Sequence, residues 1–312
     1  MKAVVFARNG GPEVLDYKDT ADPSPRDGQV AVRIEAVGVN FRDVYEREGQ
    51  GYGSTPPAVL GVEGAGVVEG TGERVAWIDV PHSYAERVAA DRDRLVPVPD
   101  GVDAELAAAA LLQGITAHYL AHDSYPIEEG DWVIVHAAAG GVGRLLTQMA
   151  KRRRGRVIAT TSSEDKARLA RDAGAEEVLD YDGFAARARE ITGGEGVAAV
   201  YDGVGRATFE ESLKAIRPLG RMILYGAASG QPPPFALQRL AGLGSLYVQR
   251  PTIGTYTRTP ELLRERAAKV FELVHTGQLE VRIGARYPLA EARQAHIDLQ
   301  ARKTTGKILL LP

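Results

Sequence analysis

The residue pattern with the clearest chemical use is a glycine-rich turn between a predicted strand and a predicted helix. Residues 133–135 form an apolar run typical of a buried parallel strand, and apolar positions from Val142 to Met149 share one helix face. Between them, Ala138, Gly140 and Gly143 fill a G-x-G-x-x-G pattern, with alanine in the first position. The unpaired N–H groups and the dipole of such a helix start favour an anion. The turn therefore predicts a dinucleotide pyrophosphate site, although an ordinary strand-to-helix turn can carry similar residues.

The segments that must position this turn alternate between strands and helices. Ligands of a parallel sheet bind beyond the carboxyl ends of its strands, and its crossovers are right-handed. We therefore expect a doubly wound, six-stranded parallel sheet with the turn at its ligand-binding edge. Its strands are predicted at residues 133–135, 156–160, 177–181, 197–201, 221–225 and 245–249, and its later helices at 164–173, 184–191 and 208–217.

The residues that follow the second strand indicate which nucleotide binds. NAD-specific sites usually place a carboxylate there, where it accepts hydrogen bonds from the ribose. Residues 160–163 are instead two threonines and two serines, which can accept a 2′-phosphate without repelling it. Lys166 could neutralise that phosphate, although it could equally be a solvated helix lysine, and Glu164 and Asp165 beside it oppose the interpretation. The pattern favours NADP(H) over NAD(H).

Composition excludes several functional classes. The chain has 312 residues, a formal net charge of −3 and no cysteine, so a disulfide framework, a thiolate nucleophile and a cysteine-containing zinc site are impossible. The net charge gives no pull toward nucleic acid, and the basic run at residues 151–156 is expected to be a solvated helix end. No stretch has the length of a signal peptide or a membrane span, so we expect a soluble cytoplasmic protein without membrane partners.

The flanking segments predict a second domain. Residues 3–7 and 15–17 suggest a hairpin, residues 29–36 alternate like a strand with one buried face, and Asn40 is placed as the N-cap of a short helix. Four glycines between Gly61 and Gly70 indicate close backbone packing in further strands at 61–68 and 73–77. A helix is expected at 104–122. The tail, with helices at 261–275 and 290–301 and a strand at 306–311, is expected to return to this β-rich domain.

Six motifs in order resemble a known family over essentially the whole chain. The chain is similar to the zinc-free, zeta-crystallin-like quinone oxidoreductases of the medium-chain dehydrogenase/reductase superfamily. The resemblance implies a GroES-like catalytic domain at residues 1–115 and 253–312, a Rossmann domain at 116–252, NADPH as cofactor and a homodimer. The motifs are residues 10–15 (GGPEVL), 40–43 (NFRD), 61–66 (GVEGAG), 136–143 (HAAAGGVG), 201–205 (YDGVG) and 244–246 (GSL).

The family pattern also implies roles for individual residues. Asn40, Tyr45 and Thr116 match catalytic positions: the first two line the substrate pocket, and Asn40 and Thr116 also contact the cofactor. The remaining cofactor contacts implied are Gly140, Gly141 and Val142 at the diphosphate, Ser162, Lys166 and Tyr181 at the adenosine 2′-phosphate, and the C-terminal Arg302.

Each of these residues also has an ordinary structural explanation. Asn40 can serve simply as a helix cap, Tyr45 as a half-buried aromatic side chain, and Arg302 as a cation at the end of its helix. Gln113 stands where some relatives carry lysine, so its role is open. The short link between Gly66 and Glu73 leaves the outer wall of the substrate pocket undefined.

The sequence predicts no metal site. In zinc-dependent relatives a histidine precedes the glutamate of a Gly-His-Glu motif, whereas Val62 fills that position here, and valine cannot ligate a metal. His118 and His122 lie four residues apart on one helix face and could share an ion, but no third ligand has a compatible spacing.

The expected reaction is reduction of a quinone by NADPH, with hydrogen bonds from Tyr45 and Asn40 stabilising the reduced oxygen in place of zinc. The sequence leaves open whether the nicotinamide gives a hydride or single electrons. Two alternatives remain open: a reductase of α,β-unsaturated carbonyls, and a non-catalytic protein of the same fold that binds NADPH or RNA. Phosphate-loop residues favour an enzyme. The sequence does not fix the homodimer interface, for which the apolar segment 243–248 is one candidate.

Overall fold

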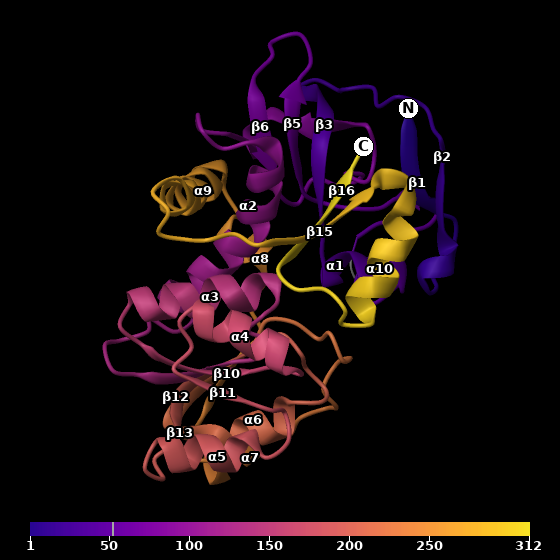
Figure 1. The fold of residues 1–312 in the computed structure, drawn as a ribbon. Coiled ribbons are helices and arrows are strands. Elements are labelled where there is room, and N and C mark those ends of the chain that lie inside the picture. The colour runs from indigo at the N-terminus through magenta and orange to yellow at the C-terminus, as the bar shows by residue number, and fades with distance from the viewer. Residues whose placement is uncertain (52) are drawn as a thin grey trace. The chain divides into compact units, whose positions relative to one another are not determined.

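The computed structural model describes residues 1–51 and 53–312, which form two compact units (Figure 1). Unit 1 contains Met1–Ile115 and Thr257–Pro312, and unit 2 contains Thr116–Tyr256. The second boundary lies after Tyr256, a few residues beyond the position expected from the sequence. Helix α2 (Ala104–Tyr119) runs across the first boundary and continues as a π-helical turn, Leu120–Ser124, so the single long helix expected here changes its hydrogen-bond pattern near its end.

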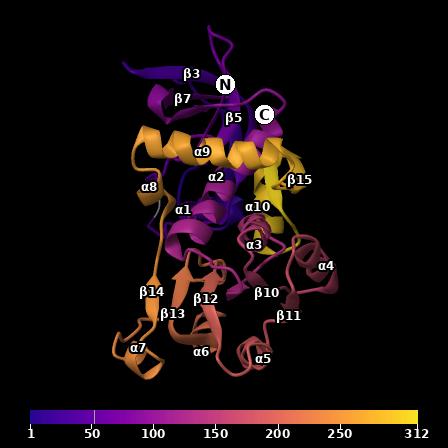
Figure 2. The same cartoon turned by 90° about the vertical axis from the view of Figure 1, so that its left-hand side faces the viewer.

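Unit 2 is built on a six-stranded parallel sheet with the order β11-β10-β9-β12-β13-β14. Figure 2 shows β14 at one edge of this sheet. The order reverses between β9 and β12, and a doubly wound sheet binds its ligand at such a reversal. The six predicted strands are therefore confirmed, with shifted ends. Their bounds are β9 (Trp132–Val135), β10 (Arg156–Thr160), β11 (Glu177–Leu179), β12 (Val197–Asp202), β13 (Ile216–Leu224) and β14 (Tyr247–Gln249).

Helices cover both faces of the unit 2 sheet. Helices α3 and α4 pack together, α5 and α6 pack together, and Figure 1 shows the two pairs on opposite sides of the strands. The core beneath α5 and α6 contains Ile134, Ile158 and Val200, which come from three neighbouring strands. The helices of the unit are α3 (Gly141–Arg152), α4 (Glu164–Asp172), α5 (Phe184–Ile191), α6 (Phe209–Ala215), α7 (Arg239–Gly242) and α8 (Ile253–Tyr256).

Unit 1 contains a seven-stranded sheet and a three-stranded sheet. The larger sheet has the order β15-β16-β3-β5-β6-β8, with β7 also paired to β3, and the smaller one has the order β2-β1-β4. The strands are β1 (Lys2–Phe6), β2 (Leu15–Asp19), β3 (Gln29–Val39), β4 (Ala58–Val59), β5 (Gly64–Val68), β6 (Arg74–Trp77), β7 (Arg87–Asp91), β8 (Leu95–Pro97), β15 (Ile283–Pro288) and β16 (Lys307–Leu311).

The chain's tail returns to the N-terminal sheet, as the sequence predicts. Strand β16 runs antiparallel to β3, where Ile308 lies opposite Val39 and Leu309 lies opposite Gly38. Strand β15, which the sequence analysis missed, pairs in parallel with β16. The remaining helices of unit 1 are α1 (Phe41–Arg47), α9 (Pro260–His275) and α10 (Ala292–Gln300), with single 3₁₀ turns at Pro12–Val14, Arg92–Arg94 and Leu289–Glu291.

Glycines admit the close backbone approach expected around β5. A Cβ on Gly66 would lie 2.0 Å from the carbonyl oxygen of Arg33 on the paired strand β3. A Cβ on Gly64 would lie 2.8 Å from the carbonyl oxygen of Ala36. The β3–β5 pairing also shifts register between Ile34 and Ala36. The predicted strand over 61–68 therefore begins only at Gly64, because the chain before it turns at Gly61, whose φ is +92°.

Candidate active site and cofactor site

The glycine-rich turn connects β9 directly to α3. Gly140 is the N-cap of α3, its N–H donates to the carbonyl of Ala137 at 2.8 Å, and the first intrahelical bond runs from the Arg144 N–H to the carbonyl of Gly140 at 2.9 Å. The N–H groups of Gly141, Val142 and Gly143 precede that bond, so they face the helix N-terminus as donors. A side chain on Gly143 would place its Cβ 2.4 Å from the carbonyl oxygen of Ala137. This geometry matches a cradle for a pyrophosphate.

A buried histidine, His136, lies between the end of β9 and the glycine-rich turn. The Nε2 atom of His136 lies 2.9 Å from Ser212 Oγ, and that hydroxyl donates to the Thr208 carbonyl. Ser212 must therefore accept from Nε2–H, which leaves Nδ1 to accept from the Thr160 hydroxyl at 2.8 Å. Burial lowers the pKa of His136, in agreement with this neutral tautomer. The sequence analysis assigned no role to His136, although a polar residue directly after a buried strand was the available signal.

A buried carboxylate orders the turn after β12. Asp202 Oδ1 accepts the N–H groups of Val204 at 2.7 Å and Gly205 at 2.9 Å, while Oδ2 accepts the Thr208 hydroxyl at 2.7 Å. Three donors therefore compensate the buried charge, and the turn is fixed at the carboxyl end of its strand.

The residues expected at a 2′-phosphate lie after β10. Ser163 is the N-cap of α4 and accepts the Lys166 N–H, while Lys166 Nζ donates to Ser162 Oγ at 3.3 Å. Two acidic residues, Glu164 and Asp165, had opposed a phosphate site here. Both are paired within α4, Glu164 with Arg171 at 2.7 Å and Asp165 with Arg168, so their charge is compensated locally.

The other two residues of this group are placed differently. Tyr181 lies beyond the end of β11, and its ring centroid is 6.1 Å from that of His136. Arg302 belongs to unit 1, whereas Ser162, Lys166 and Tyr181 belong to unit 2. Arg302 lies in the turn after α10 and has a φ of +57°.

The side chain of Asn40 lies in a buried ionic cluster in unit 1. Asn40 is the N-cap of α1, as expected, and its Nδ2 donates to Glu63 Oε1 at 2.6 Å. Lys307 Nζ donates to Asn40 Oδ1 at 3.0 Å and forms an ion pair with Glu63. The exposed fractions are 9% for Asn40 and 1% for both Glu63 and Lys307. The sequence analysis missed Lys307, which opens an otherwise apolar strand.

A second buried chain of hydrogen bonds ends on the same helix. Arg47 Nη1 lies 2.9 Å from His296 Nδ1, and an arginine can only donate, so Nδ1 accepts and Nε2 carries the proton. His296 Nε2–H then donates to the Tyr84 oxygen at 3.1 Å, and the Tyr84 hydroxyl donates to Asp43 Oδ2 at 3.0 Å. Asp43 Oδ2 also accepts the backbone N–H of Asn40 at 2.8 Å.

Burial shifts the pKa values of two members of this chain, His296 and Asp43. It lowers the pKa of His296 to about 3, assisted by the adjacent Arg47 charge, and so keeps the imidazole neutral. It raises the pKa of Asp43 to about 7 despite the opposing effect of Arg42. Asp43 Oδ1 has no hydrogen-bond partner among the residues that the structure describes, which is consistent with an oxygen that binds a proton readily.

The remaining predicted residues, Tyr45, Gln113 and Thr116, are buried. Tyr45 lies on α1, with its ring centroid 6.4 Å from that of Phe41. Gln113 and Thr116 lie on α2, on either side of the boundary between the units. Their roles in catalysis remain predictions.

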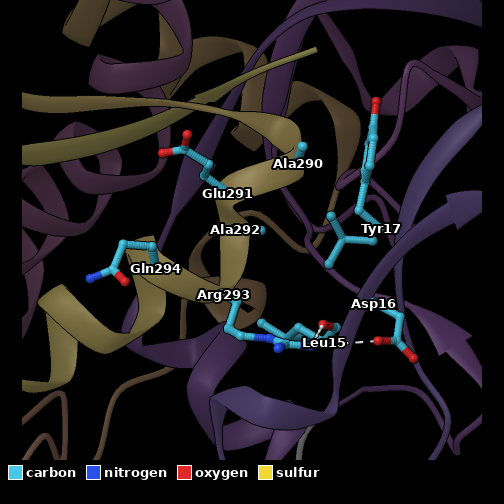
Figure 3. Close-up of a pocket in the computed structure, with 9 residues that line it drawn as sticks. Leu15, Asp16, Tyr17, Ala290, Glu291, Ala292, Arg293 and Gln294 are labelled. Carbon is cyan, nitrogen blue, oxygen red and sulfur yellow. Dashed lines mark hydrogen bonds and ion pairs between the residues drawn. The ribbon is translucent and has the colours of Figure 1, made fainter.

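A pocket of about 290 Å³ in unit 1 lies away from these residues (Figure 3). Arg293 donates to the Leu15 carbonyl at 2.8 Å and lies 3.5 Å from Asp16, so its charge is already compensated there. Figure 3 shows the Glu291 and Gln294 side chains pointing away from Arg293. Because its polar groups do not converge, this pocket is a poor candidate for the active site.

Within residues 1–51 and 53–312, no group of three or more histidine, cysteine, aspartate or glutamate side chains could hold a metal ion. Val62 is buried at the position where zinc-dependent relatives carry histidine. The rings of His118 and His122 stack with centroids 4.2 Å apart, and His122 Nδ1–H donates to the His118 carbonyl at 2.9 Å. In the same described part of the chain, no helix is both long and apolar enough to cross a membrane.

Two family models match the chain. Residues 26–81 match the alcohol dehydrogenase GroES-like domain, and residues 141–268 match the zinc-binding dehydrogenase model. A quinone oxidoreductase of Pseudomonas aeruginosa is 44% identical over 100% of this chain and 99% of its own length. A 2-haloacrylate reductase of a Burkholderia species is 37% identical over 99% of this chain and 98% of its own.

Solved structures of similar proteins also match this chain over its full length. A mycobacterial protein complexed with NADPH is 46% identical with a TM-score of 0.97, and the match covers 100% of both chains. The Escherichia coli quinone oxidoreductase complexed with NADPH is 35% identical, again with a TM-score of 0.97 and 100% of both chains covered. Together with the six-stranded Rossmann sheet and the GroES-like domain, this full-length similarity shows that the chain belongs to the zinc-free quinone oxidoreductase branch of the medium-chain dehydrogenase/reductase superfamily.

Proposed function

We propose that this NADPH-dependent oxidoreductase reduces quinones, by hydride or single-electron transfer, without a bound metal. The observation that carries the proposal is the pair of anion sites on neighbouring strands. The start of α3 offers three N–H donors to a pyrophosphate, and the hydroxyls and Lys166 after β10 suit a 2′-phosphate. NADPH carries both groups at its adenosine end.

The residues fit this cofactor in chemical detail. Gly143 has no room for a side chain, because a Cβ there would meet the backbone of Ala137 and Ala138, and this close packing of helix on strand is the role of the third glycine in a dinucleotide-binding turn. The acidic side chains beside Lys166, Glu164 and Asp165, form ion pairs with arginines of their own helix. Gly140, Gly141, Val142, Ser162, Lys166 and Tyr181 of unit 2 and Arg302 of unit 1 are therefore proposed as cofactor contacts.

Bound NADPH supplies the electrons of a hydride to the acceptor, as a pair or singly. One hydride and one proton convert a quinone to its hydroquinone, so the protein must orient the acceptor and stabilise negative charge on its oxygen. Asn40 and Tyr45 are the proposed hydrogen-bond donors to that oxygen, and Thr116 is the proposed contact to the nicotinamide or its phosphates. The last proton comes from solvent, because a hydroquinone anion is stable enough to leave the site before it is protonated.

A reductase of α,β-unsaturated carbonyls is the second candidate. The similarity to a 2-haloacrylate reductase favours it, since that relative's name specifies a conjugated acid as substrate. Hydrogen-bond donors that stabilise a reduced quinone oxygen would also stabilise an enolate. The two functions therefore differ in the shape of the acceptor and share the cofactor chemistry.

The proposal includes a homodimer formed through β14. This strand pairs only with β13 among the described residues, and its Tyr247 and Val248 side chains are exposed. An open strand edge with apolar side chains is suited to pairing with the same edge of a second copy about a twofold axis.

The deciding experiment is NADPH oxidation by the chelator-treated protein with a benzoquinone, with a conjugated enone and without acceptor, each repeated with NADH. We expect fast turnover with the quinone and a preference for NADPH. Turnover with the enone alone would transfer the assignment to the second candidate. Tight NADPH binding without turnover on either acceptor would refute both proposed substrate classes, and salt-sensitive RNA binding would then favour the non-catalytic alternative.

A further inference from the structure

The amide of Asn40 can face only one way in its buried setting. Lys307 has only donors, so the atom 3.0 Å from its Nζ must be the amide oxygen. An ionised carboxylate only accepts, so the atom 2.6 Å from Glu63 Oε1 must be the amide nitrogen. A flipped amide would place its N–H groups against the ammonium group and its oxygen against the carboxylate. Both contacts would be repulsive.

We propose that the Lys307–Glu63 ion pair is a positioning pair that aims the amide of Asn40 at the acceptor. The inference rests on the proposed function, in which Asn40 donates to the acceptor's oxygen. Nδ2 carries two N–H groups, and Glu63 accepts one. The other has no partner in the part of the chain that the structure describes. The ion pair thus leaves one donor with a fixed direction.

Lys307 also strengthens this donor. A charge-assisted bond to Oδ1 withdraws electron density from the amide and makes its N–H groups more acidic, because hydrogen bonds in a chain polarise one another. The effect is large only where water is excluded, and all three side chains are buried. Neutral Asn40 therefore acts as a stronger donor toward an oxyanion than an amide in water.

The backbone around the pair is shaped to admit it. A Cβ on Gly38 would lie 2.1 Å from Glu63 Oε1 and 2.6 Å from Lys307 Cε, so a larger residue on β3 would displace both partners. Lys307 reaches the cluster because β16 pairs antiparallel with β3. A buried ion pair is weak evidence for stability, since apolar residues of similar volume often stabilise as well. A positioning role accounts for the two buried charges here.

The test is a double-mutant cycle on Asn40→Ala and Lys307→Met, measured as kcat/KM for a benzoquinone with saturating NADPH. Loss of a donor to a developing oxyanion lowers the rate by about 10²–10³-fold, which we expect for Asn40→Ala. A misplaced group costs on the order of 10²-fold, which we expect for Lys307→Met. In the Asn40→Ala background, Lys307→Met should cause no further loss, since the amide that it positions is gone.

Two further variants separate positioning from folding. Ser83→Ala removes the 2.9 Å bond from Trp77 Nε1 in the same unit without touching Asn40, so it should lower thermal stability but leave kcat/KM unchanged. Lys307→Met with Glu63→Gln removes both charges together, so no buried charge is left alone if the single variant fails to fold. This double variant should fold and show the same loss of kcat/KM at saturating NADPH.

Each result has a distinct meaning. Wild-type kcat/KM in Lys307→Met or in the charge-free double variant, or losses that simply add in the cycle, would overturn the positioning role while leaving the function of Asn40 intact. Wild-type kcat/KM in Asn40→Ala would overturn both the donor role of Asn40 and the positioning of its amide. Quinone turnover itself would then still stand.

Discussion

Replacing Asp43 by asparagine should stabilise unit 1 at alkaline pH and have little effect in acid. The Asp43 carboxyl is fully buried, and its pKa of about 7 lies above its ordinary value of 3.8. The folded protein therefore holds this proton longer than the unfolded chain does. The stabilisation that results is complete below pH 3.8 and is lost as the pH rises through 7. At ~1.4 kcal/mol per pH unit, the ionised carboxylate costs about 4 kcal/mol of unfolding free energy at pH 8.

His296 has the opposite pH dependence. Its pKa of about 3 lies below the ordinary value of 6.5, so its stabilisation is complete above pH 6.5 and is lost as the pH falls toward 3. Between about pH 4 and 6.5 the two slopes oppose each other, and wild-type unit 1 should show little pH dependence from this pair. In Asp43→Asn the His296 slope remains alone. The unfolding free energy should then rise by about 2 kcal/mol from pH ~4.5 to 6.5.

Urea unfolding over this pH range measures both effects. The chain contains two tryptophans, Trp77 in unit 1 and Trp132 in unit 2, so a Trp132→Phe background restricts the fluorescence signal to unit 1. This choice avoids treating a two-unit chain as a single transition. A free-energy difference between Asp43→Asn and the parent that is the same at pH ~4.5 and 8 would refute the assignment of a raised pKa to Asp43.

Three other variants test the proposed sites. Gly143→Ala should weaken NADPH binding at least ~10-fold in a fluorescence titration, because its Cβ would meet the Ala137 carbonyl, and unchanged binding would exclude this turn as the phosphate site. Lys166→Ala should reduce the ratio of NADPH to NADH affinity by about tenfold, since it removes one charged hydrogen bond, and an equal loss for both cofactors would argue against a 2′-phosphate contact. Tyr247→Asp should convert the dimer to a monomer in light scattering, whereas an unchanged mass would exclude the β14 edge.

The nucleotide-binding unit was the most predictable part of the chain. Its strands are short apolar runs separated by amphipathic helices, and such local patterns are visible without knowledge of the partner strands. The prediction was wrong only about where strands begin and end. Strand β11 stops at Leu179, which leaves Tyr181 outside it, and β13 begins at Ile216, before the predicted start at residue 221. Whether a strand residue forms a ladder hydrogen bond depends on its neighbour's length, which local sequence does not specify.

The sequence analysis missed strand β15 because that strand also depends on its neighbour. Its residues alternate between half-buried and exposed positions, so the strand has no fully buried face, and Gly284 and Pro288 weaken the local signal. It forms because β16 offers an edge, with Tyr287 opposite Leu310. The tail's return was predictable from β16, whose four consecutive apolar residues require a buried sheet position.

The candidate site residues also differ in predictability, according to whether their partners are near or distant in the sequence. Ser162 and Lys166 are four residues apart, and the start of a helix brings them within hydrogen-bond distance, so local sequence was sufficient to group them. Asn40 and Lys307 are 267 residues apart, and only the β3–β16 register joins them. A lysine at the head of an apolar strand signals burial with a partner, but it does not reveal which partner.

The first turn of α1 is where the two buried clusters of unit 1 meet. Asp43 accepts the backbone N–H of Asn40, while Lys307 and Glu63 hold its side chain. His296 of α10 reaches the same turn through Tyr84. Asn40 is thus fixed at its backbone by its neighbour Asp43 and at its amide by Glu63 and Lys307 from distant parts of the chain. If Asn40 is the proposed donor, an amide held this firmly loses little entropy when it binds an acceptor, and the proposed metal-free stabilisation of an oxyanion depends on such preorganisation.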